Sequence, residues 1–388
     1  MNNCGVVPST RFLRRFMQFD ADTGLLQCEC GTQLADVLNL VEPQGWFLPV
    51  TPGTKFATVG GCVANDVHGK NHHLEGSFGR HVTRFALRRT DGTVLICSPT
   101  ENTGWFNATI GGLGLTGFIE WVELRLKRVP NSAINLETIK YNDLATFFAL
   151  SAESEHSHEF TAAWIDCLAS REKLGRGHFL RGNHAKITQP KPAASKLKLA
   201  MPLDPPLSLI NSLSLRAFNS LYYNRQMQER SFATVHYDPF FYPLDFVHDW
   251  NRIYGPKGFL QYQCVVPNDV SYDATREMLE RIAAANSGSF LVVLKVFGDV
   301  PSPGLLSFPR PGATLALDFP YQGNKTLHLF DQLDDVVVQA GGAIYPAKDA
   351  HMKAEHFKRF YPNLETFTQY KDPGISSSFW RRVMEANA

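Results

Sequence analysis

The sequence predicts an α+β protein made of two regions, because the pattern of apolar, polar and glycine residues changes after Pro130. The first region contains short alternating strands separated by glycine-rich loops, and the second contains longer strand-like runs with helices between them. A chain of 388 residues with 44% hydrophobic residues can bury one large core or two ordinary ones.

In the first region, residues 4–50 alternate short strands with one helix-like segment over 31–45. Residues 82–98 read as a hairpin, because two apolar runs flank the turn residues Asp91 and Gly92. Residues 117–129 alternate apolar and polar side chains, which is typical of a strand.

The second region predicts a mostly antiparallel sheet with helices on one face. A helix is expected over 273–288, with a glycine at its end. Further helical segments are expected over 325–349 and 352–362. The strand-like runs are residues 133–141, 161–169, 258–267, 290–298 and 314–321.

Residues 186–215 carry lysines, prolines and leucines without clear periodicity, so they predict a mobile loop. Their apolar and basic character leaves two alternatives open, a surface that rests on a membrane or a simple excursion of the chain. Met1 is followed by a polar stretch, which argues against a signal peptide, and the sequence has no apolar run of membrane-spanning length.

Charge and cysteine usage exclude several classes of partner. A net charge of +1 gives no general attraction for nucleic acid. The seven cysteines include Cys28 and Cys30, whose spacing does not match a zinc site, so we expect no metal site and a reduced, cytosolic or cytosol-facing protein.

The segment VGGCVANDVHGKNHHLEGSFGRHV (59–82) is the most informative part of the chain. Gly60 and Gly61 follow an apolar run and predict a strand that ends where the backbone approaches another group closely. The polar side chains that follow predict a loop or short helix that lines a ligand, and the alternative is a solvated glycine-rich turn. Adjacent His72 and His73 lack the spacing of a metal hydrolase. The polar side chains are His68, Lys70, Asn71, His72 and His73.

This segment, together with GGLGLTGFI, FLQYQCVVP, LALDFP and GGAIYPAKDA, resembles flavoprotein oxidases of the vanillyl-alcohol-oxidase type, and within them the decaprenylphosphoryl-β-D-ribose 2′-oxidase family. The resemblance runs in order over nearly the whole chain. It implies a PCMH-type FAD-binding domain from residues 1–129 together with 343–388, and an inserted substrate domain over 130–342.

The resemblance also implies the site. Lys348 is similar to the family lysine at the flavin and the sugar, and Tyr345 would line the same pocket. His68 would relay a proton or position the ring, and Lys70 and Gln263 would donate hydrogen bonds to the substrate. The alternatives are a surface lysine, a structural tyrosine and a structural imidazole. Residues expected to border a non-covalently bound FAD are Gly53, Gly61, Cys62, Asn65, His68, Gly69, Gly117 and Ile119.

The activity that the resemblance implies is oxidation of a ring hydroxyl of a polyprenyl-phosphate-linked pentose to a ketone. A short-chain reductase would complete an epimerisation in cell-wall polysaccharide biosynthesis, at the cytoplasmic face of the inner membrane. Ala316 and Thr314 depart from the cysteine and asparagine of relatives. The identity of the sugar therefore stays open, and a sugar-alcohol or aldonolactone oxidase is the alternative.

A second departure concerns the N-terminal glycine- and arginine-rich turn that holds the FAD pyrophosphate in this family. Met1–Gly5 aligns just after that turn. We expect the sequence to be clipped. A chain that truly starts here would bind FAD weakly and expose a sheet edge, or would be a flavin-free scaffold.

Overall fold

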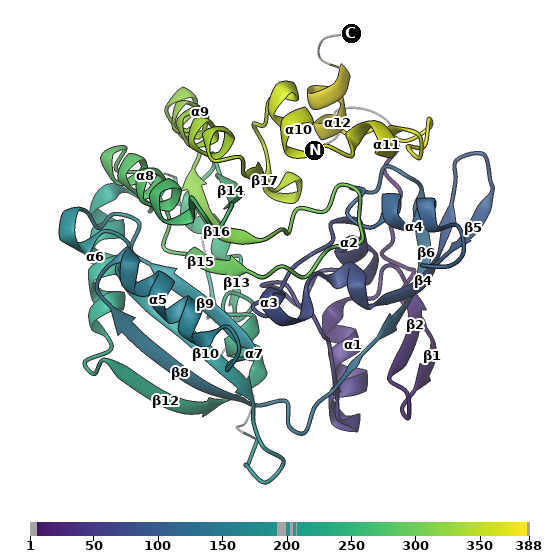
Figure 1. Ribbon diagram of the computed structural model, residues 1–388, viewed down its shortest axis with the longest axis horizontal. Helices are drawn as coiled ribbons and strands as arrows, with labels where there is room; N and C mark the ends of the chain where they lie inside the picture. The colour runs from purple at the N-terminus through teal and green to yellow at the C-terminus, as the bar shows by residue number, and fades with distance from the viewer. Residues whose placement is uncertain (1–5, 192–198, 202–204, 207, 386–388) are drawn as a thin grey trace. The chain divides into compact units, whose positions relative to one another are not determined.

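The computed structural model describes residues 6–191, 199–201, 205–206 and 208–385, and the chain divides into two compact units (Figure 1). Unit 1 comprises Met1–Ser132, Val300–Pro309 and Met352–Ala388. Unit 2 comprises Ala133–Asp299 and Arg310–His351.

These bounds differ from the predicted domain limits at three places, the first of which is residues 130–132, which fall in unit 1. Residues 343–351 fall in unit 2, because the backbone of Ala343 and Ile344 pairs with a strand of the unit 2 sheet. Residues 300–309 fall in unit 1, where the Leu305 N–H donates to the Asn107 carbonyl at 2.9 Å. Which unit binds FAD and which binds substrate remains a prediction.

Unit 1 is built on a five-stranded sheet of order β1-β2-β6-β4-β5, in which every neighbouring pair is antiparallel. The predicted hairpin is confirmed, since β4 and β5 pair around the Asp91–Gly92 turn. The strands are β1 (Phe16–Asp20), β2 (Leu25–Glu29), β4 (Val82–Arg88), β5 (Val94–Cys97) and β6 (Phe118–Arg125). A small second sheet pairs β3 (Trp46–Phe47) with β7 (Lys127–Arg128).

The helices of unit 1 are short. Gly60 and Gly61 lie in one of them, α2, so the predicted strand end is wrong at this point. The Thr58 hydroxyl accepts a hydrogen bond from the Gly61 N–H at 3.2 Å and caps the helix, which explains why the chain turns helical here. The helices are α1 (Leu34–Val41), α2 (Val59–Ala64), α3 (His72–Glu75), α4 (Thr103–Thr109), α10 (Ala354–Phe360), α11 (Leu364–Thr368) and α12 (Ser378–Trp380).

Unit 2 is built on an eight-stranded sheet of order β12-β8-β10-β9-β15-β16-β14-β17, and its pairs are antiparallel as predicted. The strands are β8 (Ile134–Tyr141), β9 (Phe160–Ile165), β10 (Gly177–His184), β12 (Arg230–Val235), β14 (Phe259–Val266), β15 (Val292–Phe297), β16 (Gly312–Pro320) and β17 (Ala343–Ile344). Two short strands, β11 (Leu199–Ala200) and β13 (Val247–His248), pair separately.

Helices cover both faces of this sheet, which corrects the prediction of helices on one face. Figure 1 shows α5 (Leu144–Ser154), α8 (Ser271–Ala284) and α9 (Asn324–Gln339) over one face. Phe179 of β10 packs on Phe147 of α5, with ring centroids 6.0 Å apart. The next residue back, His178, instead bonds to the Tyr223 carbonyl of α6 (Ser212–Asn224). Because side chains alternate along a strand, α6 lies on the opposite face. A further short helix is α7 (Tyr237–Phe241).

The predicted mobile loop over 186–215 lies partly outside the described residues. Within the described part, residues 212–215 already belong to α6, because the Asn211 side chain caps it by accepting from the Leu213 and Ser214 N–H groups. Across the described ranges, we find no helix with the length and apolar character needed to cross a bilayer.

Candidate active site

Unit 1 contains a cavity of about 580 Å³, which we call the glycine-lined cavity. It brings together three predicted FAD contacts, Gly61, Gly117 and Ile119. Gly53, Cys62, Asn65, His68 and Gly69 are not among its lining residues. The described residues that line it are Val6, Val7, Pro8, Thr10, Cys30, Thr58, Gly60, Gly61, Ala64, Leu113, Gly114, Leu115, Gly117, Phe118, Ile119, Gly374, Ile375, Ser376, Ser377 and Arg381.

Its glycines are required for different reasons. A Cβ on Gly60 would lie 2.7 Å from the Cβ of Cys30, so glycine allows α2 to approach the end of β2. Gly114 has φ +71°, and a Cβ there would have no neighbouring atom within 4 Å. Such a cavity, with backbone and apolar walls and a few polar groups, fits a large planar cofactor such as FAD.

Asn65 and Cys62 support α2 from outside that lining. The Asn65 amide donates to the Gly61 carbonyl at 2.9 Å and closes the end of the helix. Cys62 is fully buried, and burial raises the pKa of its thiol, so it stays a neutral packing residue.

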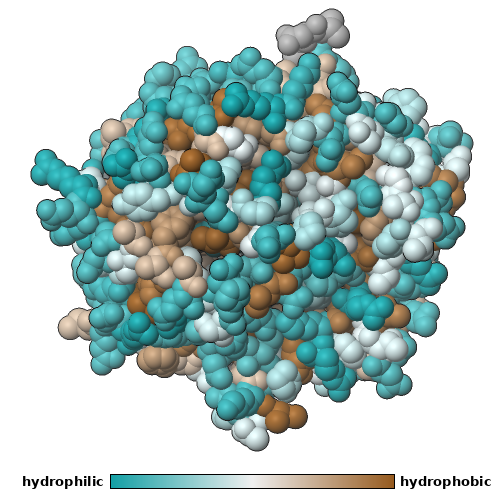
Figure 2. Space-filling view, in the orientation of Figure 1, coloured by the Kyte–Doolittle hydropathy of each residue, from teal (hydrophilic) through white to brown (hydrophobic). Residues whose placement is uncertain are grey.

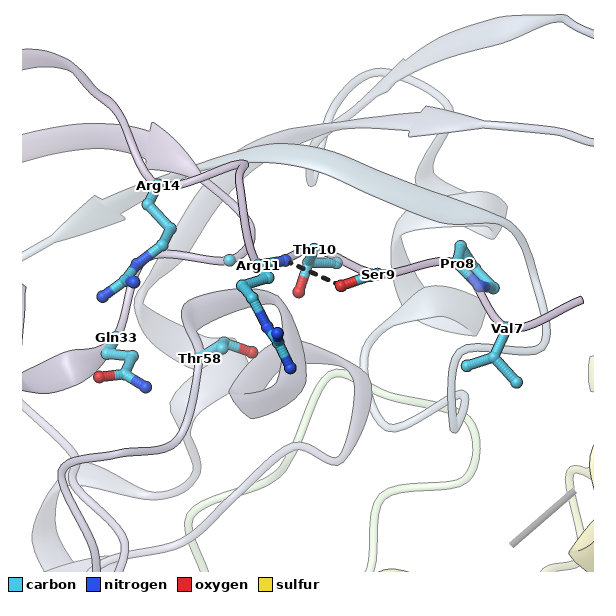
Figure 3. Close-up of a pocket in the computed structure, with 9 residues that line it drawn as sticks. Val7, Pro8, Ser9, Thr10, Arg11, Arg14, Gln33 and Thr58 are labelled. Carbon is cyan, nitrogen blue, oxygen red and sulfur yellow. Dashed lines mark hydrogen bonds between the residues drawn. The ribbon is translucent and has the colours of Figure 1, made fainter.

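A second cavity of about 410 Å³, the arginine cavity, adjoins the first, since both are lined by Val7, Pro8, Thr10 and Thr58. Figure 3 shows Arg11 extended toward Thr58 and Arg14 toward Gln33. The Arg11 N–H donates to the Ser9 hydroxyl at 3.4 Å, and the Arg14 guanidinium lies 3.3 Å from the Asp36 carboxylate. Sequence reasoning missed these arginines, although the basic run RFLRR was a signal for them.

The polar loop after α2 is shaped by Asn71. Its amide donates to the Pro49 carbonyl at 2.8 Å, and a Cβ on Gly69 would lie 2.7 Å from the Asn71 side-chain oxygen. His68 forms a backbone bridge with Ser77, and its ring lies 6.1 Å from the ring of Phe308. Burial lowers the pKa of Lys70 to about 8.

Asp66 anchors the segment 300–309 within unit 1. Its buried carboxyl accepts from the Ser307 hydroxyl at 2.5 Å and from the Gly79 N–H at 2.8 Å. Burial raises the pKa of this carboxyl, and the hydrogen bonds to it oppose that shift. Because Phe308 follows Ser307 directly, the anchor also sets the ring that contacts His68.

In unit 2, Gln263 lies on the sheet face opposite α5, α8 and α9. The strand register aligns Gln263 with one residue on each of four other strands, so the five residues form one row across the sheet. Its amide donates to the Thr314 hydroxyl at 3.1 Å, and the Gln261 amide donates to Asp318 at 2.9 Å. We call Gln261, Gln263, Thr314 and Asp318 the polar sheet face. The row consists of His178, Trp164, Val293, Ala316 and Gln263.

Tyr345 and Lys348 lie next to this face. The Tyr345 N–H donates to the Gln263 carbonyl at 2.8 Å, and the Lys348 N–H donates to the Tyr345 carbonyl at 3.1 Å. Burial lowers the pKa of Lys348, and the charge of Asp318 opposes that shift. Burial raises the pKa of Asp318, and the hydrogen bond from Gln261 and the charge of Lys348 oppose that shift. Sequence reasoning quoted Asp318 within LALDFP without giving it a role.

The structure therefore groups the predicted residues into two sets. Unit 1 holds the predicted cofactor contacts, His68 and Lys70, and unit 2 holds Gln263, Tyr345 and Lys348. Among the described residues, no group of three or more His, Cys, Asp or Glu side chains is arranged to hold a metal ion.

Comparison with known proteins gives similarities over most of the chain. Residues 2–98 match the FAD binding domain family. The chain is 33% identical to decaprenylphosphoryl-beta-D-ribose oxidase of Mycolicibacterium smegmatis, over 99% of this chain and 86% of that protein. It is 34% identical to an uncharacterized Streptomyces coelicolor protein, over 89% of this chain and 98% of the relative. A Neurospora crassa protein named "Putative D-arabinono-1,4-lactone oxidase" is 23% identical over 39% of this chain and 26% of its own length.

Proposed function

Because the chain belongs to the family of FAD-dependent oxidoreductases that includes decaprenylphosphoryl-β-D-ribose oxidase, we propose that it oxidises a secondary hydroxyl of a polyprenyl-phosphate-linked pentose to a ketone. The similarity to that oxidase over 99% of the chain is the observation that carries the proposal. The reaction would be half of an epimerisation, and a short-chain reductase would return the hydride.

Bound FAD supplies the hydride acceptor for such an oxidation. The glycine-lined cavity would hold it without a covalent link, through Gly61, Gly117 and Ile119. The arginine cavity supports this proposal, because Arg11 and Arg14 would offer guanidinium groups to the diphosphate of the dinucleotide. We retain the remaining predicted cofactor contacts as proposals, namely Gly53, Cys62, Asn65, His68 and Gly69.

The reacting hydroxyl would lie against the polar sheet face. Lys348 would place a positive charge beside the oxygen as its proton leaves, which stabilises the developing negative charge. Tyr345 would orient the sugar ring, and His68 would accept the proton. Asp318 would keep Lys348 charged, since its carboxylate raises the pKa of that lysine.

Lys70 and Gln263 would hold the substrate by its polar groups. A lysine ammonium suits a phosphate, and Gln263 is held in place by Thr314. A lipid-linked substrate would bring the protein into peripheral contact with the cytoplasmic face of the inner membrane.

A second candidate is a sugar-alcohol or aldonolactone oxidase, favoured by Ala316 beside Gln263 in the strand register. A small side chain there leaves room for a different polyol. The partial similarity to the Neurospora crassa protein supports it further.

Anaerobic mixing of the flavin-loaded protein with each substrate class separates these candidates. The proposal expects the flavin absorption near ~450 nm to bleach with a polyprenyl-phosphoryl pentose and not with arabinitol or an aldonolactone. Bleaching by the soluble polyols alone would support the second candidate. Bleaching by none of them would overturn both substrate assignments.

A further inference from the structure

Helix α6 of unit 2 exposes apolar side chains on a surface helix. Leu213 is 77% exposed and Leu221 is 74% exposed, although leucines are most often found inside proteins. Leu213, Ala217 and Leu221 are four residues apart, so they form one stripe, which we call the outer face of α6.

The opposite side of α6 is held firmly by the sheet. Tyr222 packs on Trp164 with ring centroids 4.5 Å apart, and Tyr223 stacks on His178. The Asn219 amide donates to the buried Asp166 carboxylate at 2.7 Å. The outer face is therefore a fixed surface of the folded unit.

Positive charge flanks the outer face on both sides. At about 100° per residue, Arg216 and Arg225 project from opposite edges of the stripe. The Arg216 guanidinium donates to the Asn286 side chain at 2.8 Å, and Arg225 donates to the Tyr222 hydroxyl at 2.9 Å. Neither of these partners is a carboxylate, so neither neutralises the arginine.

This charge is local. Residues 212–227 contain two arginines and no acidic residue, whereas the whole chain has 38 basic and 37 acidic residues. Met227, just beyond the helix, is 92% exposed and adds apolar surface. Over the face in Figure 2, hydrophobic residues are scattered among hydrophilic ones, so exposed apolar side chains alone mark no site.

We propose that the outer face of α6 rests on an anionic lipid bilayer, with Leu213 and Leu221 at the acyl boundary and Arg216 and Arg225 at the headgroups. An apolar stripe with flanking arginines is the pattern of helices that lie in the plane of a membrane surface. Lipid phosphates match the arginines, whereas a purely apolar partner would leave both guanidinium groups without a counter-charge.

The position of α6 favours a lipid further, and this step rests on the proposed function. His178 under α6 and Gln263 of the polar sheet face lie in one register row, on the same face of the sheet. Four strand spacings separate them, which is about 19 Å. A helix docked on the bilayer would bring that face within reach of a sugar whose polyprenyl chain stays in the membrane.

Vesicle co-sedimentation tests the surface without any substrate. The protein should sediment with phosphatidylcholine vesicles that contain about 30% phosphatidylglycerol, and about tenfold or more weakly with phosphatidylcholine alone. The double variant Leu213→Ser/Leu221→Ser should lower binding to the anionic vesicles by about tenfold or more. Arg216→Glu/Arg225→Glu should lower it similarly and remove the difference between the two vesicle types.

Val94→Ser is the matched control, because Val94 is an exposed apolar residue on β5 of unit 1. It should bind vesicles as the unchanged protein does, and all variants should keep its melting temperature. The proposal fails if the unchanged protein stays in the supernatant with anionic vesicles, or if the leucine variant binds them equally well.

Two further measurements keep the outcomes distinct. The unchanged protein could instead be a dimer that does not bind vesicles and that Leu213→Ser/Leu221→Ser converts to a monomer. That result would make this face a contact between two copies and would overturn the proposal. Flavin bleaching by a detergent-solubilised polyprenyl-phosphoryl pentose should be unchanged in the leucine variant. If the protein binds vesicles and only soluble polyols bleach its flavin, the membrane surface is supported and the proposed substrate is refuted.

Discussion

The glycine-lined cavity of unit 1 is walled mainly by backbone and apolar side chains, whereas the polar sheet face of unit 2 consists of hydrogen-bonding side chains with Lys348 next to them. The first depends on missing side chains, as at Gly60, where a Cβ would meet Cys30 at 2.7 Å. The second depends on charge, as at Lys348 and Asp318, which oppose each other's pKa shifts. We therefore expect substitutions around the glycine-lined cavity to alter cofactor retention and substitutions around the polar sheet face to alter turnover.

Lys348→Met should produce the largest effect. Loss of the charge beside the reacting oxygen should lower turnover by roughly 10²- to 10⁴-fold, while the flavin spectrum of the purified protein stays unchanged. Lys325→Met, at an exposed position on α9, is the control and should keep full activity. If Lys348→Met lost its flavin instead, the division of roles between the glycine-lined cavity and the polar sheet face would be wrong.

Gly60→Ala should test the close packing of α2 against Cys30 at the glycine-lined cavity. The added methyl group overpacks against Cys30, so the free energy of unfolding should fall by about 1–3 kcal/mol and FAD should dissociate more readily. Flavin release on dilution and thermal melting measure both effects. Gly53→Ala is the control for the free energy of unfolding alone, because a Cβ there has no neighbour within 4 Å. An equal loss of unfolding free energy in both variants would refute the packing argument.

Asp318→Asn should test the electrostatic coupling between Asp318 and Lys348. Asp318 raises the pKa of Lys348, so its removal lets that pKa fall further, and the lysine loses its charge at lower pH. The alkaline limb of the pH–rate profile should therefore move to lower pH, by up to about one unit. Asp335→Asn, at an exposed position on α9, should leave the limb in place. A shift to higher pH in Asp318→Asn would contradict the coupling.

Thr314→Val should have the smallest effect. Gln263 would lose the acceptor of its 3.1 Å hydrogen bond and would orient the substrate less well. A bond of this kind contributes about 1 kcal/mol, so KM should rise by roughly fivefold with little change in kcat. A fall in kcat with KM unchanged would indicate that Gln263 acts on the reaction step instead.

Local patterns in the sequence predicted much of the architecture. The Asp91–Gly92 turn fixed the hairpin, and the strand-like runs after Pro130 form the antiparallel sheet. Local rules failed where a single side chain changed the outcome. Thr58 caps a helix over Gly60 and Gly61, and Asn211 starts α6 inside the expected loop.

Contacts between distant parts of the chain could not be predicted. Ser307 reaches Asp66 across 241 residues, and no local pattern marks either residue as the other's partner. The side chains of His178 and Phe179 point to opposite faces of the sheet, and α6 covers the face of His178. The alternation of side chains along the strand does not by itself indicate which face a helix will cover. Site residues came from the family resemblance, because isolated lysines and tyrosines carry no local signal of their roles.

The Asp66 anchor has a consequence for synthesis on the ribosome. Unit 1 begins the chain, yet its buried carboxyl meets Ser307 only after β15 has been translated, and its last helices follow residue 351. Unit 2 is complete in sequence at His351. We therefore expect the unit that starts later to finish folding first, and a nascent chain stalled once His351 has left the ribosomal exit tunnel should protect unit 2 from protease while unit 1 is still cut.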